Sequence, residues 1–171
     1  MEIMSNFTGV KNFFAFFETQ KTLVIAENFN LLVVKFNSKW DILKEKEIKY
    51  FQKIFGICKF GDEKLALIDG TKKISLFNFE NLYYIEEIPQ RVPFKFELEI
   101  EGDSKGKYLF VKVNYYMRES IIYLLKFIDF RGFSLQKQYA VKKKIYSFKF
   151  FEKSLNFVSY EGKEESNLSL F

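Results

Sequence analysis

Short stretches in which apolar and polar residues alternate recur along the whole chain. In FKFELEI (94–100), apolar residues occupy every second position and charged residues lie between them. A period of two is typical of a β-strand with one buried and one solvated face. Aromatic and β-branched residues are frequent, and no sustained apolar stripe at helical spacing occurs. The pattern therefore predicts an all-β fold built from short strands.

Pairs of such strands recur at nearly regular spacing. KLALIDGTKKISLFNFEN (64–81) matches KTLVIAENFNLLVVKFNS (21–38) almost position for position, with two strands joined by a polar turn in each. Two further copies lie at 106–130 and 153–171. The first strands of the four copies begin at Leu23, Leu65, Leu109 and Leu155, separations of 42, 44 and 46 residues. This spacing indicates an array of structural repeats.

Each pair is flanked by further strands. We expect preceding strands at 12–18, 53–60, 93–100 and 144–151, and following strands at 40–48, 81–88 and 133–141. Four short strands per repeat are typical of a β-propeller blade. The sequence thus predicts one propeller-like domain over residues 1–171, with four four-stranded blades at 12–48, 53–88, 93–141 and 144–171. Residues 1–8 are the candidate for a strand that closes the last blade.

Two arrangements of four blades remain open. The blades can close into a small ring, which removes exposed sheet edges, or they can form an open arc that a partner completes. The segment PQRVP (89–93) holds both prolines of the chain. We interpret it as the loop between the second and third blades rather than as a domain linker.

The third strand of each repeat ends in a characteristic pair of residues. The first three pairs are Phe36-Asn37, Phe77-Asn78 and Ile128-Asp129. They resemble the Trp-Asp ending of WD-repeat propellers, and the resemblance covers essentially the whole chain. The Gly-His dipeptide of that family is missing, and because the chain holds no histidine the family's internal hydrogen-bond network cannot be carried over. The literal Trp40-Asp41 is interpreted as the opening of the following strand.

Composition excludes most enzyme chemistry. Hydrophobic residues make up 48% and aromatic residues 20% of the chain, which is far from a disordered composition. With no histidine and only Cys58 as a thiol, the nucleophile–histidine systems and the His/Cys zinc sites are ruled out. No glycine-rich phosphate-binding motif occurs. A metal site built from carboxylates alone, or an Asp/Glu acid–base pair, stays open. We expect no catalytic residue, metal or cofactor, and a protein that is not an enzyme.

The single cysteine, the short apolar runs and the N-terminal sequence suggest a location inside the cell. A single cysteine is typical of a reducing compartment, and no apolar run approaches the roughly 18 residues of a membrane span. The N-terminus has no signal-peptide pattern. We expect an intracellular protein, nuclear or cytoplasmic, without a membrane partner.

Positive charge supplies the candidate contact residues for a protein or RNA partner. The net charge is +5, but only three of the 27 basic residues are arginine, the side chain favoured for bidentate phosphate recognition. Arg91, Lys142, Lys143 and Lys144 fall in connections between blades, on one rim. Lys72, Lys73 and Arg118 fall on hairpin turns that we assign to the opposite rim.

Aromatic and acidic residues are assigned structural roles. We expect the first-strand aromatics to lie in the core near the propeller axis; they are Phe13, Phe14, Phe16, Phe17, Phe148, Phe150 and Phe151. Cys58 is expected to be an inert core residue. The acidic residues Asp62, Glu63, Asp69 and Asp103 are expected to stabilise turns through bonds to the backbone.

A more specific resemblance covers roughly residues 12 to 113. The segment Lys64 to Phe77, followed by the connector at 89–93, resembles the early blades of the WD-repeat subunit of the tRNA guanine-N7 methyltransferase. That resemblance implies a non-catalytic subunit which stabilises a methyltransferase that binds tRNA and S-adenosylmethionine. The chain departs from the family where Val113-Asn114-Tyr115-Tyr116 replaces Asp-Lys-x-Gly-Asp. The leading hypothesis is thus a protein-interaction scaffold, and the alternative is a nucleic-acid-binding module that uses a lysine-rich rim.

Overall fold

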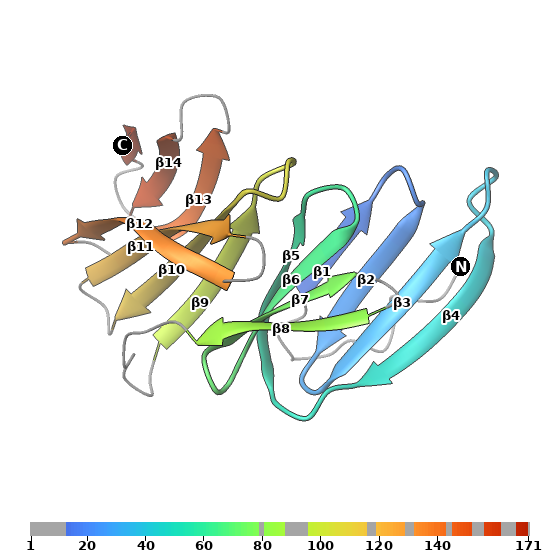
Figure 1. Cartoon of the computed structure of the whole chain (residues 1–171). Helices are drawn as coiled ribbons and strands as arrows, with labels where there is room; N and C mark the ends of the chain where they lie inside the picture. Colours follow the sequence, from blue (N-terminus) through green and yellow to red (C-terminus); the bar gives the residue numbers. More distant parts are fainter. Residues whose placement is uncertain are drawn as a thin grey trace.

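The fold is an array of four antiparallel β-sheets (Figure 1). The computed structural model describes residues 13–78, 81–87, 96–115, 119–128, 132–142, 145–151, 156–161 and 167–170. In this part of the chain the regular structure consists of strands, and no helix long and apolar enough to cross a membrane is found. Consecutive strands pair by short turns within each sheet, so each predicted repeat forms one sheet.

We call the sheets blades 1 to 4 in chain order. Blade 1 contains β1 (Phe13–Phe17), β2 (Thr22–Glu27), β3 (Asn30–Phe36) and β4 (Ile42–Lys49). Blade 2 contains β5 (Ile54–Phe60), β6 (Lys64–Asp69), β7 (Lys73–Asn78) and β8 (Asn81–Glu87). Blade 3 contains β9 (Phe96–Gly102), β10 (Tyr108–Tyr115), β11 (Glu119–Ile128) and β12 (Gly132–Val141). Blade 4 contains β13 (Ile145–Phe151), β14 (Asn156–Glu161) and β15 (Asn167–Leu170).

The blades form an open arc and not a closed ring. The first strand of blade 2, β5, contacts the first strands of both neighbours, β1 and β9. Figure 1 shows blade 1 and blade 4 at opposite ends of the array. This settles the choice between the two predicted arrangements for the described residues. Among the described residues, blade 4 has three strands. The proposed closing strand at 1–8 lies outside the described residues.

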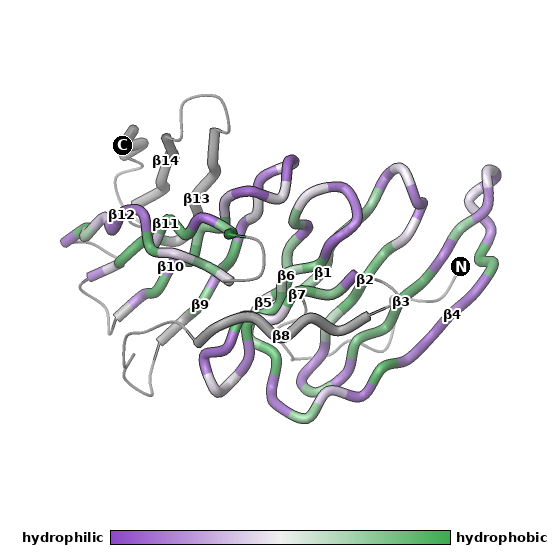
Figure 2. The backbone as a smooth tube through the Cα atoms, in the orientation of Figure 1, coloured by the Kyte–Doolittle hydropathy of each residue, from purple (hydrophilic) through white to green (hydrophobic). Residues whose placement is uncertain are grey.

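The inner strands of blades 1, 2 and 3 have apolar residues at successive positions, so these blades carry apolar side chains on both faces. We call the face toward the next blade the forward face and the other one the rear face. On the forward face of blade 1, Ala15, Val24 and Leu31 form one core cluster with Leu65 and Leu67 from the rear face of blade 2. The same arrangement joins blades 2 and 3, through a second cluster with these buried members: Phe60, Ala66, Ile68, Ile74, Leu76, Leu98, Ile100, Leu109, Val111, Val113, Tyr123 and Leu125. Figure 2 shows the apolar strands of this interior.

The aromatic residues of β1 are divided between the two faces. Phe17 is fully buried and Phe13 packs beside the first core cluster, as predicted. The prediction is wrong for Phe14, whose side chain is 75% exposed. Phe14 alternates with Phe13 and Ala15 and therefore points to the rear face of blade 1. The side chains of Phe148, Phe150 and Phe151 lie outside those that the structure describes.

The turn after β3 corrects one strand boundary. β4 begins at Ile42, so Trp40 and Asp41 belong to the turn and do not open the strand. Trp40 has a φ of 68°, which is the left-handed region that non-glycine residues rarely adopt. The Asn37 side-chain oxygen accepts hydrogen bonds from the backbone N–H groups of Lys39 and Asp41 at 2.8 and 2.9 Å. This Asn-centred turn supplies the local bonds that hold Trp40 in that conformation.

Two acidic residues stabilise turns as predicted. Asp69 Oδ1 accepts from the backbone N–H of Thr71 at 2.8 Å. Asp103 Oδ1 accepts from the backbone N–H groups of Lys107 and Tyr108 at 2.6 and 2.9 Å. Both carboxyl groups are buried in these hydrogen bonds, which is the common structural use of Asp in a turn.

Candidate interaction surface

The described basic residues among those predicted to lie on two rims belong to one edge of the blades. The β4–β5 connection and the β6–β7 turn meet at this edge, where Gly70 N–H donates to the Lys53 carbonyl at 2.8 Å. The connection between β12 and β13 meets the β10–β11 hairpin in the same way, because Ile145 N–H donates to Ser120 Oγ at 2.8 Å. The assignment of Lys72 and Lys73 to the rim opposite Lys142 is therefore wrong.

This correction follows from the order of the strands within a blade. In four antiparallel strands, the second and third strands join at the edge where the fourth strand also ends. Of the seven predicted contact residues, the structure describes Lys72 and Lys73 at the β6–β7 turn and Lys142 after β12. Arg91, Arg118, Lys143 and Lys144 lie outside the described residues. We call this edge the lysine rim.

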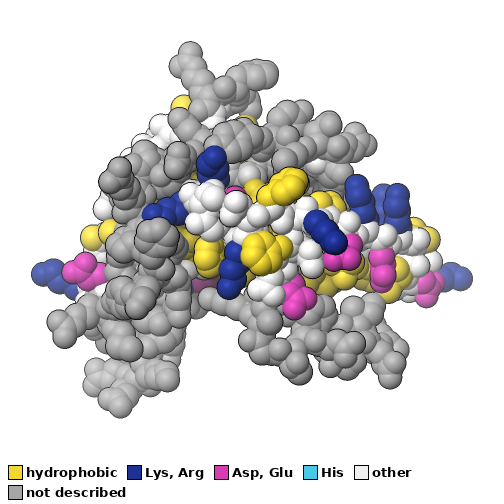
Figure 3. Space-filling model, turned by 90° about the horizontal axis from the view of Figure 1, so that it is seen from below, with side chains coloured by type: hydrophobic (Ala, Val, Ile, Leu, Met, Phe, Trp, Pro, Cys, Tyr) yellow, Lys and Arg dark blue, Asp and Glu magenta, His cyan; other side chains and the backbone are white. Residues whose placement is uncertain are grey.

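The lysine rim carries charges of both signs. Figure 3 views the molecule from this side and shows dark-blue basic side chains interspersed with magenta acidic ones. Away from the rim itself, exposed Lys44, Glu45, Lys46 and Glu47 alternate in charge along the outer strand β4. Sequence-independent phosphate binding needs a continuous basic patch. The described side chains form no such patch in this view.

A polar network joins blades 1 and 2 without any histidine. The Tyr50 hydroxyl, in the connection between the blades, lies 3.1 Å from Asp69 Oδ2 and 3.1 Å from Ser75 Oγ. The Tyr50 ring also packs on Phe77, with ring centres 6.1 Å apart. The sequence analysis identified Phe77 and Asp69 separately but missed Tyr50, whose role depends on the path of the connection. The Tyr50 side chain thus contacts the β6–β7 turn at Asp69 and strand β7 at Ser75 and Phe77.

Replacing Tyr50 by Phe is expected to lower the free energy of unfolding by about 1–2 kcal/mol, because the buried Asp69 carboxylate loses a donor. Burial raises the pKa of the Tyr50 hydroxyl above its ordinary value of 10.0, against a smaller opposite effect of the Ser75 hydrogen bond. A raised pKa means that the folded state holds this proton more tightly than the unfolded state does. The stabilisation is then complete below pH 10 and is lost as the pH rises through the pKa of the folded state.

Chemical denaturation at several pH values measures this effect. The difference in unfolding free energy between the wild type and Tyr50→Phe should shrink above pH 10. Tyr108→Phe, at a half-buried tyrosine of blade 3, is the matched control. A difference that stays constant across this range would contradict the role of the Tyr50 proton.

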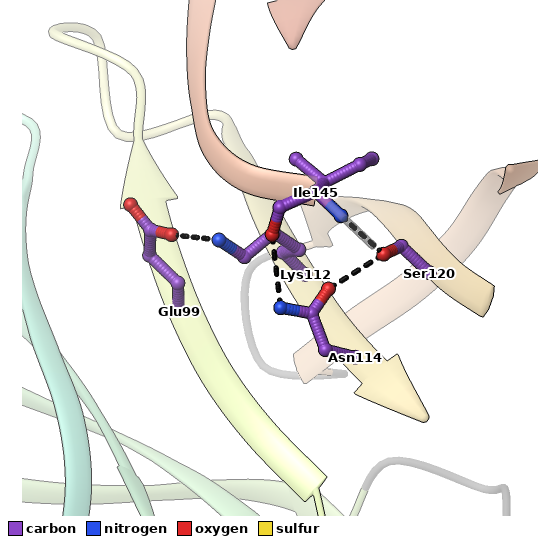
Figure 4. A network of polar contacts seen from close by, with 5 residues as sticks. All are labelled: Glu99, Lys112, Asn114, Ser120 and Ile145. Atoms are coloured by element: carbon purple, nitrogen blue, oxygen red, sulfur yellow. Dashed lines mark hydrogen bonds and ion pairs between the residues drawn. The ribbon is translucent and has the colours of Figure 1, made fainter. Parts of the chain in front are cut away.

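A second polar network joins blades 3 and 4 (Figure 4). Asn114 Nδ2 donates to the Ile145 carbonyl at 2.9 Å, and Ser120 Oγ donates to Asn114 Oδ1 at 2.6 Å. The side chains of Asn114 and Ser120 are buried. Beside them the buried Lys112 ammonium forms an ion pair with Glu99. These polar groups are held within the fold, so we assign them to blade packing rather than to ligand binding.

The rear face of blade 1 differs from the rear faces of blades 2 and 3. Leu65 and Leu67 of blade 2, and Leu109 and Val111 of blade 3, are at most 3% exposed because the preceding blade covers them. In blade 1 the corresponding face of β1, β2 and β3 is mainly apolar, and its apolar side chains are half-buried or exposed apart from the buried Val34. The outer strand β4 adds Glu45 and Glu47 to this face. We call this surface the open rear face, and define it by Phe14, Phe16, Leu23, Ile25, Phe36 and Trp40.

Trp40 extends the open rear face at the edge opposite the lysine rim. Its ring is 5.8 Å from that of Phe16 and 6.0 Å from that of Phe36. The Lys21 ammonium lies 5.4 Å from the centre of the indole, within the range of a cation–π interaction. Trp40 remains 57% exposed. Exposed tryptophan beside other aromatic rings is typical of residues that dominate protein–protein binding.

The described residues offer little else that could react with a substrate. No group of three or more His, Cys, Asp or Glu side chains in this part of the chain could hold a metal ion. Burial raises the pKa of the Cys58 thiol far above its ordinary value, and the nearby Glu101 adds to this. The thiol packs beside the second core cluster and stays protonated, so it is a poor nucleophile.

Comparison with known proteins identifies the fold but no family. No protein-family model and no curated protein matches the chain. Among solved structures, the β-propeller domain of Cps50 (Swd1) from Myceliophteria thermophila is similar, with a TM-score of 0.58 and 10% identity over 92% of this chain. A protein from Bacteroides uniformis, proposed to be a 6-phosphogluconolactonase, has a TM-score of 0.61 and 13% identity over 92% of this chain.

Both neighbours are larger than this chain. The match covers 57% of the first and 52% of the second. The likeness confirms the propeller-like fold predicted from the sequence. Since one neighbour carries the name of an enzyme, the fold by itself assigns no activity.

Proposed function

We propose that the protein is a non-catalytic β-propeller scaffold that binds another protein. The observation that carries this proposal is the open rear face of blade 1, where Phe14 and Trp40 are 75% and 57% exposed. The same face of blades 2 and 3 is covered by a neighbouring sheet. A contiguous apolar surface of this kind is costly in water unless a partner covers it.

The proposed partner class follows from the sequence resemblance. The segment Lys64 to Phe77 resembles the non-catalytic WD-repeat subunit of the tRNA guanine-N7 methyltransferase. We propose a catalytic methyltransferase subunit as the partner, with tRNA reaching the complex through that subunit, in the nucleus or the cytoplasm. This part of the proposal rests on the resemblance alone.

Affinity purification from the native organism, followed by mass spectrometry, tests the scaffold. The tagged wild type should retain a protein that Phe14→Ser loses. Phe51→Ser is the matched control, because Phe51 is a 95% exposed phenylalanine outside the open rear face. Recovery of a methyltransferase would support the specific partner, whereas a different stable partner would exclude it. If no protein depends on Phe14, the open rear face is not the binding surface.

The alternative function is direct nucleic-acid binding by the lysine rim. The finding that Lys72, Lys73 and Lys142 belong to one edge favours this alternative, but the mixed charges in Figure 3 do not. Direct binding requires tRNA affinity without a protein partner, and log K should then fall linearly with log salt concentration. Absence of such binding by the purified chain at low salt would eliminate the alternative.

A further inference from the structure

We infer that the open rear face of blade 1 binds the last blade of a second copy of this chain, so that two arcs close into one ring. This inference rests on the proposed function, because it names the protein that occupies the proposed binding surface. A different protein partner would then bind the completed ring, and Phe14→Ser would remove that partner by preventing the ring from forming. The inference is carried by the packing that already joins the blades within one chain.

The first argument is continuity with the existing interfaces. The rear faces of blades 2 and 3 are each covered by the forward face of the preceding blade. The residues of the open rear face occupy the same strand positions as the buried ones, since Leu23 and Ile25 correspond to Leu65 and Leu67 in the repeat. The surface that fits the open rear face is therefore the forward face of another blade.

The second argument is the number of sheets. The match to two larger propellers covers 57% and 52% of their lengths, so one copy supplies about half of such a fold. Two arcs of four sheets supply eight, which is within the range of about four to eight blades found in propellers. Two identical contacts related by a two-fold axis would close the ring and cover the open rear face of both copies.

Trp40 makes the contact directly observable. It is the single tryptophan of the chain and belongs to the open rear face, so its emission reports whether that face is covered. Sedimentation or light scattering of the purified full chain should give twice the mass of 20.5 kDa at micromolar concentration. On dilution, the mass should halve and the Trp40 emission should shift to longer wavelength in the same concentration range.

Two variants test the position of the contact. Phe14→Ser should raise the dissociation constant of the dimer at least about tenfold, as expected for loss of a large aromatic anchor. Phe51→Ser should leave it unchanged. A monomer at all concentrations would overturn the inference, and so would a dimer whose assembly does not alter Trp40 emission. A monomer that still retains a different protein through Phe14 would leave the proposed scaffold function intact, so the two failures are distinguishable.

Discussion

Replacing Gly102 by Ala is expected to destabilise the protein by about 3 kcal/mol or more, because a methyl group has no space there. A Cβ at Gly102 would lie 2.3 Å from the Lys59 carbonyl oxygen and 3.1 Å from the Phe60 Cα. These are backbone atoms of β5, so the clash cannot be relieved by rotating a side chain. Gly102 ends β9 where it packs against β5 of blade 2, and the change should force the two sheets apart.

Gly70→Ala is the matched control for Gly102→Ala. A Cβ at Gly70 would have its nearest contact at 3.4 Å, with the Phe55 ring, which is close to ordinary van der Waals distance. We expect this variant to stay within about 0.5 kcal/mol of the wild type. Urea unfolding followed by circular dichroism measures both variants. Equal stability of Gly102→Ala and Gly70→Ala would mean that the blades can separate at no cost.

Replacing Asn114 by Leu is expected to lower the free energy of unfolding by about 3 kcal/mol. The Ile145 carbonyl would lose the donor at 2.9 Å and the Ser120 hydroxyl would lose the acceptor at 2.6 Å. Both lost bonds lie in a buried site, where an unsatisfied polar group costs about 1–3 kcal/mol. Because the network joins blade 3 to the first strand of blade 4, we expect blade 4 to lose most of the stability.

Native-state hydrogen exchange measures where the Asn114→Leu effect lies. Amides of β13 and β14 should exchange faster in the variant, whereas those of β5 and β6 should keep their protection. Gln138→Leu, at an exposed position of β12 in the same blade, is the control and should change little. Uniform loss of protection across all blades would show that the blades unfold as one unit and that the Asn114 network has no local role.

The four-blade arc differs from a closed propeller in its two end blades. Blades 2 and 3 are covered on their rear faces, while blade 1 exposes aromatic side chains on the equivalent surface. A ring has no end faces, so this exposure is a direct consequence of the open arrangement. The proposed scaffold function and the proposed second copy both follow from that one physical feature.

Local patterns in the sequence determined the strands and their grouping into blades. The strand pairs predicted from Leu23, Leu65 and Leu109 form β2–β3, β6–β7 and β10–β11, because alternation and turn chemistry act between residues close in sequence. The turn roles of Asp69 and Asp103 were predictable for the same reason. The strand predicted at 40–48 is observed as β4 (Ile42–Lys49). It starts later than predicted because Asn37 organises a turn around Trp40.

Only the tertiary structure decided which surfaces are covered. The inner strands of blades 1 and 2 are apolar on both faces, so the sequence pattern does not distinguish the covered rear face of blade 2 from the open rear face of blade 1. Phe14 and Phe17 look alike in the sequence, yet one is 75% exposed and the other is buried. The partners of Tyr50 also depend on contacts between blades. Those contacts join residues far apart in the chain, and they are set by how the sheets pack rather than by any local pattern.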